Sequence, residues 1–237
     1  MENPVVVDMF CGAGGEGQGI KQPAPKFGRG GSLKIYLGVA GSSKVQAFVR
    51  EHDLGWLMTP TNSRDPKEIQ YCLDNGAFVD WKNGTEWNER KFLSLIKRYP
   101  DYDFAVAPDI VCGGGQSLMR SLEYVGKIPG PLYLAVQDGM DAATVTEYID
   151  RFDGLFVGGS IPWKFNTARM WADLAHLHRK KCHAGRVGTW EGFIHMHFCG
   201  VDSVDTTTPA RHQDDSQIRK YLEHLKYQSL LPFEVSA

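Results

Sequence analysis

The segment 132–159, "LYLAVQDGMDAATVTEYIDRFDGLFVGG", decides the fold. Its first six residues, of which the first five are apolar, are typical of a buried strand, and residues 154–159 are a second such segment. Between them, "AATVTEYIDRF" over 142–152 carries apolar residues at helical spacing. A strand, a helix and a second strand in so short a stretch predict a right-handed βαβ unit with two parallel strands.

The same alternation continues on both sides of this unit. Other strands are predicted over 33–40, 55–60, 70–78, 103–110, 183–188 and 201–207. Helices are predicted over 42–53, 88–99, 116–127, 167–181, 190–200 and 215–230. About eight strands, most of them followed by a helix, predict an α/β fold: a closed (β/α)8 TIM-like barrel, compact for its class. An open, doubly wound sheet is the alternative.

Residues 1–32 stand outside this pattern. "PVVVDMF" is strand-like and runs into a glycine-rich turn, and "KQPAPKFGRGGS" has the composition of a linker. We therefore divide the chain into a short N-terminal extension, 1–32, and a barrel, 33–237.

The charge, the cysteine spacing and the apolar runs limit the classes of protein to which the chain can belong. A net charge of −2 gives no overall positive field for nucleic acid, although a local basic patch remains open. The five cysteines include no CxxC pair, which favours free thiols in a reducing compartment. No apolar run is long enough to span a bilayer. We expect a soluble, cytoplasmic protein with no membrane partner.

Polar residues or glycines stand where several predicted strands end. They are Asp74, Asp109, Gln137, Gly158 with Gly159, and Asp205. The carboxyl ends of the strands form the active site of nearly every TIM-barrel enzyme. Their position therefore favours a functional site over ordinary loop polarity.

Five short motifs occur in order along the barrel: "LDNGAF" (Leu73–Phe78), "AVQDG" (Ala135–Gly139), "FDGLFVGGS" (Phe152–Ser160), "RVGT" (Arg186–Thr189) and "GVDSVDTTTPAR" (Gly200–Arg211). They resemble elements of the tRNA-guanine transglycosylase (queuine tRNA-ribosyltransferase) superfamily. Within it, the chain is most similar to the short phage and bacterial DNA-guanine transglycosylases that insert 7-deazaguanines. The fold of that family is a (β/α)8 barrel, in agreement with the strand count.

The resemblance implies two catalytic residues, Asp205 as the nucleophile and Asp74 as the general acid/base. Displacing a base passes through an oxocarbenium-like sugar, which a carboxylate stabilises and captures covalently, as in retaining glycosidases. A second acid protonates the departing base and later deprotonates the incoming one. We expect both carboxyl groups to converge on one pocket that solvent can enter.

The resemblance also implies substrate-binding residues: Phe78, Asp109, Gln137, Gly158, Gly159 and Arg211. Phe78 would stack on the base, and Asp109, Gln137 and the glycine backbone would read its edge. Lys164, Arg186 and Arg211 are either contacts for the phosphate backbone or ordinary surface charges.

The chain departs from the family in some respects. Asn75 stands where the family has serine, and no cysteine follows Arg211, so the zinc site of the tRNA enzymes is missing. The histidines of "FIHMHF" with Cys199 and His212 are a weak candidate cluster, and we expect no metal and no cofactor.

Within 1–32, "VDMFCGAGGEGQGI" resembles motif I of DNA cytosine-5 methyltransferases, which hold S-adenosylmethionine. Such enzymes also need a Pro-Cys nucleophile motif, and the chain contains no Pro-Cys dipeptide. We interpret the segment as an orphan fragment that hints at DNA modification in a phage-like setting.

The predicted function is therefore a base-exchange glycosyltransferase that replaces guanine by a 7-deazaguanine in nucleic acid, with DNA favoured over tRNA. The alternatives are a tRNA-guanine transglycosylase, a cytosine-5 methyltransferase fragment and a non-catalytic nucleic-acid-binding barrel. A homodimer or a partner subunit stays open. Asp202 lies three residues before Asp205, on the opposite face of the predicted strand, and is interpreted as structural.

Overall fold

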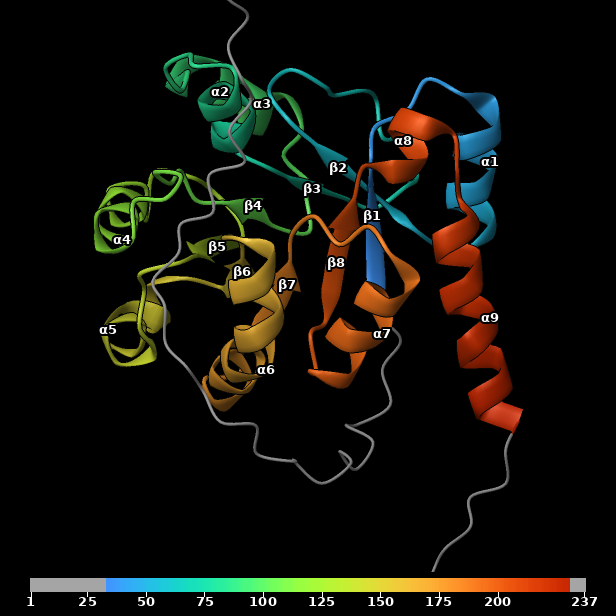
Figure 1. Cartoon of the computed structure of the whole chain (residues 1–237). Coiled ribbons are helices and arrows are strands. Elements are labelled where there is room, and N and C mark those ends of the chain that lie inside the picture. The colour runs from blue at the N-terminus through green and yellow to red at the C-terminus, as the bar shows by residue number, and fades with distance from the viewer. Residues whose placement is uncertain (1–32, 231–237) are drawn as a thin grey trace, which may run out of the picture.

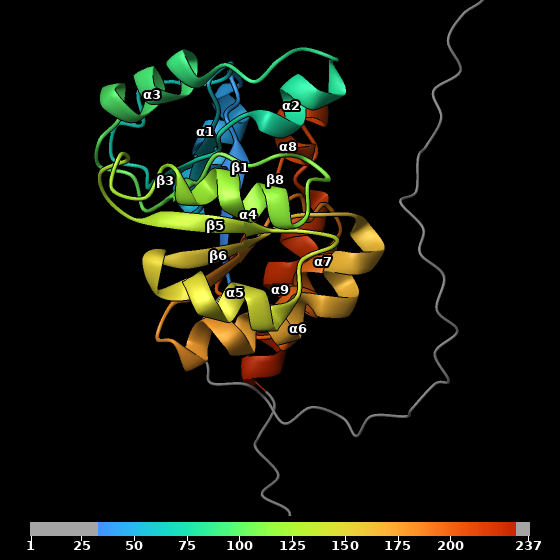
Figure 2. The ribbon, with the colours of Figure 1, turned by 90° about the vertical axis from the view of Figure 1, so that its left-hand side faces the viewer.

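The computed structural model describes residues 33–230, and these form a closed barrel of eight parallel strands in chain order. The prediction of a (β/α)8 barrel is confirmed, and the open-sheet alternative is wrong. The predictions for residues 1–32 lie outside the described residues. Figures 1 and 2 show the helices around the outside of the strands.

The strands are short, and each pairs with its two neighbours to form the barrel wall. They are β1 (Lys34–Gly38), β2 (Gly55–Met58), β3 (Tyr71–Leu73), β4 (Ala105–Val106), β5 (Leu132–Val136), β6 (Gly154–Val157), β7 (Lys181–Ala184) and β8 (Ser203–Thr206). The wall closes where β8 pairs with β1 through four residue pairs, whereas β3 and β4 share the single pair Leu73↔Ala105.

The helices cover the outer face of the wall. They are α1 (Ser43–Glu51), α2 (Ala77–Lys82), α3 (Glu89–Arg98), α4 (Gly115–Leu122), α5 (Ala142–Tyr148), α6 (Ile161–Leu177), α7 (Trp190–Phe198), α8 (Thr208–His212) and α9 (Ser216–Leu230). Side chains that accept a backbone N–H fix the start of several of them: Asn88 for α3, Asp141 for α5 and Thr189 for α7.

Side chains alternate across the wall and divide the core into two parts. Ile35 and Leu37 belong to the large core between strands and helices, whereas Tyr36 between them belongs to a smaller cluster of eight residues. That cluster draws on β1 to β6 and includes Cys72, Tyr133 and Phe156. Its members alternate in sequence with those of the large core, which places them inside the barrel.

Several predicted segments differ from the structure in their boundaries, and two of these differences affect residues of the candidate site. The strand predicted over 70–78 ends at Leu73, because the Asp74 carboxylate accepts the Gly76 N–H at 2.7 Å and Gly76 takes a left-handed φ of 80°. The chain then enters α2, a helix that the sequence pattern did not indicate, with Phe78 in its first turn. Helix α6 begins at Ile161, ahead of the predicted residue 167, with proline in its first turn.

Candidate functional site

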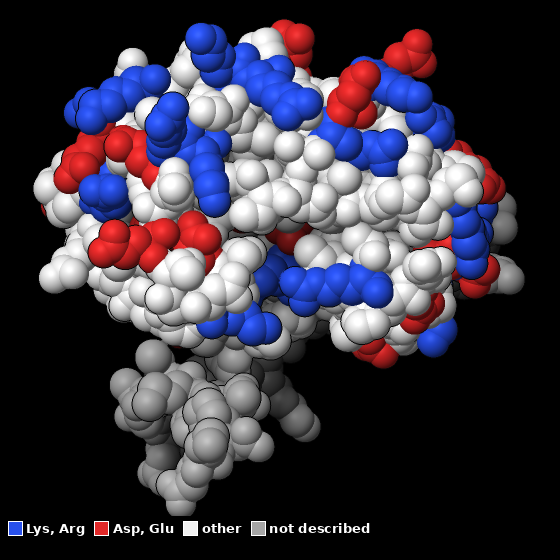
Figure 3. Space-filling model, turned by 90° about the horizontal axis from the view of Figure 1, so that it is seen from above, with Lys and Arg blue, Asp and Glu red and all other residues white. Residues whose placement is uncertain are grey.

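The predicted site residues gather at the carboxyl ends of the strands. Asp74, Gln137 and Gly158 directly follow β3, β5 and β6, Asp109 follows β4, and Asp205 lies within β8. Helix α8, which follows β8, lies at the top in Figure 1, so Figure 3 looks onto this end of the barrel. It shows a hollow near the middle of the face, with acidic atoms at its bottom and Lys or Arg side chains beside it.

Asp205 lies deep in the barrel. Its side chain is only 2% exposed, so its access to solvent is narrower than the sequence analysis expects. The backbone N–H of Arg186 donates to Oδ1 at 3.1 Å, and Nε2 of His183 lies 3.1 Å from Oδ2. A carboxylate offers about four lone-pair directions, so two hydrogen bonds leave acceptor capacity on both oxygens.

Asp74 is a carboxyl group whose proton affinity is raised. Burial contributes most, and the negative charges of Asp205 and Asp109 add to it, so that the pKa of Asp74 rises from 3.8 to about 7. The Gly76 N–H and the charge of Arg186 act in the opposite direction. The charges of Asp205 and Asp109 act on Asp74 from the carboxyl ends of β8 and β4, the same end of the barrel. At neutral pH Asp74 is therefore poised between acid and base.

Asp109 is held by two amide side chains. Asn75 Nδ2 donates to Oδ1 at 2.8 Å, and Gln137 Nε2 lies 3.4 Å from Oδ2. Asn75 also donates to the Ala107 carbonyl at 2.7 Å, and Gln137 to Ser117 Oγ at 2.7 Å. Burial raises the pKa of Asp109. Asn75, the departure from the family pattern, thus orients Asp109.

Arg186 contacts several predicted site residues at once. Its guanidinium carbon lies 4.0 Å from the centroid of the Phe78 ring, and Nη2 donates to the Gly159 carbonyl at 3.2 Å. Its backbone has a φ of 56°, a left-handed conformation that is costly for a residue with a side chain. One face of the Phe78 ring, which we predict to stack on a base, is therefore covered by a planar guanidinium.

The two glycines after β6 have different reasons to be glycine. A Cβ on Gly159 would lie 2.4 Å from Asp138 Oδ2, and its φ is 71°. Asp138 in turn accepts hydrogen bonds from the N–H and hydroxyl of Ser160, both at 2.7 Å. A Cβ on Gly158 would meet only ordinary contacts. Gly159 is thus fixed by its turn, and its carbonyl points to Arg186.

Lys164 is neither a phosphate contact nor a surface charge, in contrast to both alternatives expected from the sequence. The side chain, predicted to meet phosphate or solvent, is buried, with the residue 1% exposed. Its ammonium donates to the carbonyl of Gly185, directly before Arg186. Burial, with the charge of Arg186, lowers the pKa of Lys164 to about 8, although Asp205 and Asp138 favour the charged form. Lys164 therefore stabilises the turn whose Arg186 N–H binds Asp205, and its buried ammonium is not accessible to nucleic acid.

Arg211 lies on α8, the short helix that follows β8. It is exposed on α8, and within residues 33–230 its side chain makes no hydrogen bond to the other predicted site residues. Asp202 agrees with its structural interpretation, because its carboxylate accepts the Cys182 N–H at 2.8 Å and contacts Lys181 and His176 at 2.9 Å.

Sequence reasoning missed His183, which lies against the predicted nucleophile. The residue is fully buried on β7, and β7 pairs directly with β8. The available signal was a histidine in a predicted strand, "HAGRVG", beside a motif that the family resemblance already included.

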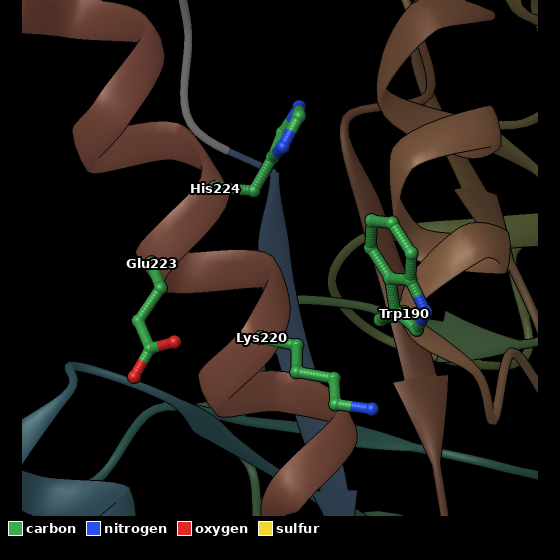
Figure 4. Close-up of a pocket in the computed structure, with 4 residues that line it drawn as sticks. All are labelled: Trp190, Lys220, Glu223 and His224. Atoms are coloured by element: carbon green, nitrogen blue, oxygen red, sulfur yellow. The ribbon is translucent and has the colours of Figure 1, made fainter.

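A metal-binding cluster and a surface pocket are the two other kinds of candidate site. Among the described residues no group of three or more His, Cys, Asp or Glu side chains is arranged to hold a metal ion. A surface depression of about 330 Å³ lies between the start of α7 and α9. Figure 4 shows the residues that line it: Trp190, Lys220, Glu223 and His224. It draws on none of the strand-end residues, so it is separate from the candidate site.

Within residues 33–230, every helix falls short of the length and apolar character needed to cross a bilayer. No family model matches the chain, and no curated protein sequence matches it either.

Proposed function

We propose that the protein is a base-exchange glycosyltransferase that replaces guanine in a nucleic acid by a 7-deazaguanine, with Asp205 as nucleophile and Asp74 as general acid/base. The observation that carries the proposal is the pair of carboxyl groups itself. Asp74 follows β3 and Asp205 lies on β8, and β1 and β2 stand between these strands in the wall. The charge of Asp205 contributes to the raised pKa of Asp74.

The two environments suit two different roles. Asp205 has a carboxylate fixed by His183 and by the Arg186 N–H, as a nucleophile requires. Asp74 has a pKa of about 7, close to the ideal for a group that donates and later accepts a proton at neutral pH. A carboxyl group whose environment raises its proton affinity is the acid/base residue in many enzymes.

The reaction then proceeds in two displacements at the sugar. Asp205 attacks the anomeric carbon while the bond to guanine breaks, and Asp74 gives its proton to the departing base. The incoming 7-deazaguanine passes a ring N–H proton to Asp74, and its nitrogen displaces the Asp205 carboxylate. Both aspartates return to their starting protonation states, and the polynucleotide backbone stays intact.

The polar groups near the pocket suit a purine edge. Within the described residues, Gln137 Oε1 accepts no hydrogen bond, so it is available to an N–H of the base. Asp109 supplies carboxylate acceptors on the same side, and the Gly159 carbonyl supplies another once Arg186 releases it. Guanine carries N–H donors that such acceptors recognise.

The test is incorporation of radiolabelled guanine into duplex DNA and into tRNA, in parallel reactions. Wild-type protein is expected to label one of them, and Asp205→Ala to label neither while keeping the wild-type circular dichroism spectrum. A matched control is Asp173→Ala, which removes an exposed aspartate of α6 outside the cluster. Activity retained by Asp205→Ala, or no incorporation by the wild type into either nucleic acid, contradicts the proposal.

A covalent intermediate provides a second measurement. Wild-type protein mixed with substrate nucleic acid is expected to yield a denaturation-resistant adduct, and Asp205→Ala is expected to yield none. Asp74→Asn keeps the nucleophile but cannot protonate guanine, so its adduct forms more slowly by about 100-fold or more.

A further inference from the structure

A histidine, a serine and the proposed nucleophile form a hydrogen-bonded chain inside the barrel. His183 Nδ1 lies 2.8 Å from Ser203 Oγ, and Nε2 lies 3.1 Å from Asp205 Oδ2. His183 and Ser203 are directly paired residues of β7 and β8. His183 is fully buried, and the side chain of Asp205 is 2% exposed.

We infer that His183, held in a single tautomer by Ser203, is a positioning residue that fixes the Asp205 carboxylate for attack. The inference rests on the proposed function, since it concerns the nucleophile of that reaction.

The packing holds the imidazole ring in one orientation. Phe156 stacks on it with ring centroids 5.0 Å apart and an angle of 17° between the planes. Phe104, also 5.0 Å away, and Tyr36, 5.9 Å away, contact the ring at steeper angles. A ring packed on these sides cannot turn over without moving the barrel core, so its two nitrogens keep their partners.

Hydrogen-bond chemistry then fixes the protons. An ionised nucleophile only accepts hydrogen bonds, so the proton faces Asp205 on Nε2 of His183. Burial lowers the pKa of His183 and favours the neutral ring, whose Nδ1 is then an acceptor. The Ser203 hydroxyl donates to it. The other tautomer would turn two acceptors toward each other at the Asp205 contact.

The neutral ring has a chemical advantage for a nucleophile. It holds Oδ2 with one directed N–H, while the Arg186 N–H holds Oδ1, so the plane of the Asp205 carboxylate is fixed at both oxygens. A full positive charge in the same place would neutralise the carboxylate as an ion pair and weaken its attack. Fixing the plane matters because a misplacement of about 1 Å costs about 100-fold in rate.

The experiment compares three substitutions in the full chain. His183→Phe keeps an aromatic ring against Phe156 but removes both nitrogens. The amide nitrogen of Gln occupies nearly the place of Nε2, so His183→Gln keeps the donor toward Asp205. The shorter His183→Asn reaches only the Ser203 side, and it is the matched control for the Gln variant.

Initial rates are measured with radiolabelled guanine and whichever of duplex DNA or tRNA the wild type labels. We expect His183→Phe and His183→Asn to lower kcat by about 100-fold with the KM for guanine unchanged. His183→Gln is expected to stay within about 10-fold of the wild-type kcat. Thermal unfolding of each variant shows whether it is folded at the assay temperature.

The outcomes separate the two proposals. A wild-type kcat in folded His183→Phe, or equal losses in the Gln and Asn variants, overturns the inference and leaves the proposed function intact. No incorporation by the wild type removes the proposed function instead. A readout without activity is the nitrogen chemical shifts of His183. A neutral ring protonated on Nε2 is expected, and a ring protonated on Nδ1 or on both nitrogens overturns the inference.

Discussion

Replacing Asp74 by asparagine is expected to stabilise the fold at high pH and not at low pH. Burial, with Asp205 and Asp109, raises the pKa of Asp74 from 3.8 to about 7. Each pKa unit corresponds to about 1.4 kcal/mol, so ionising Asp74 in the folded protein costs up to about 4 kcal/mol. The folded state binds more protons than the unfolded state between these two values. The free energy of unfolding therefore falls as pH rises from about 4 to about 7.

Asparagine removes the titration but keeps the carbonyl oxygen that accepts the Gly76 N–H. Because Asp74 is partly exposed, solvent reduces the effect, and we expect Asp74→Asn to be more stable than wild type by about 2–4 kcal/mol at pH 8. At pH 4.5 the two proteins are expected to agree within about 1 kcal/mol. Urea unfolding followed by circular dichroism at pH 4.5, 6 and 8 gives these differences. A difference that does not change with pH, or a variant less stable at pH 8, refutes the reasoning.

Three further predictions concern neighbouring positions. Burial raises the pKa of Asp202, but its hydrogen-bond partners outweigh burial and lower it. Asp202→Asn should therefore lose about 1–3 kcal/mol of unfolding free energy at pH 7 and progressively less as pH falls below about 4, which is the opposite sign to Asp74→Asn. Urea unfolding at the same pH values checks this prediction. In Gly185→Ala the new methyl carbon would lie 2.4 Å from the Phe156 ring, so unfolding free energy should drop by about 1–3 kcal/mol, and an unchanged melting temperature contradicts this. Arg186→Gly uncovers the ring that the guanidinium occupies, so free guanine should bind about 2- to 5-fold more tightly by calorimetry, and weaker binding would assign the guanidinium to the guanine site itself.

The fold could be predicted from the sequence alone because the alternation of strand and helix patterns repeats along the chain. Each predicted βα unit supports the same fold, so an error at the boundary of one element does not change the prediction of a barrel. The errors came where a few side chains redirect the backbone, as at Asp74 and Gly76, where a hydrogen bond and a left-handed residue end β3 early. Similarly, the strand predicted over 103–110 is reduced to two residues before Pro108, which has no N–H to pair.

The candidate site was predictable only in part. Asp74 and Asp205 could be named because barrels place reactive groups at strand ends and because both fall in motifs of the resemblance. The contacts of His183 and Lys164 could not, since they depend on partners about 20 residues away in sequence, Asp205 and Gly185. Lys164 lies before the helix predicted over 167–181, where a lysine is typical of a surface charge, and only the packing of α6 on β7 shows that it is buried.

The short pairing between β3 and β4 has a consequence for the local stability of the barrel wall. One residue pair connects these strands, and near the mouth the Asn75 side chain spans the gap by bonding the Ala107 carbonyl and Asp109. Two backbone hydrogen bonds complete the join, from the Leu73 N–H to the Phe104 carbonyl and from the Asp103 N–H to the Tyr71 carbonyl. Because one residue pair stands here against four at the β1–β8 closure, the amide hydrogens of β3 and β4 should exchange with solvent sooner than those of β1 and β8. If the wall opens locally, it opens first beside Asp74 and Asp109.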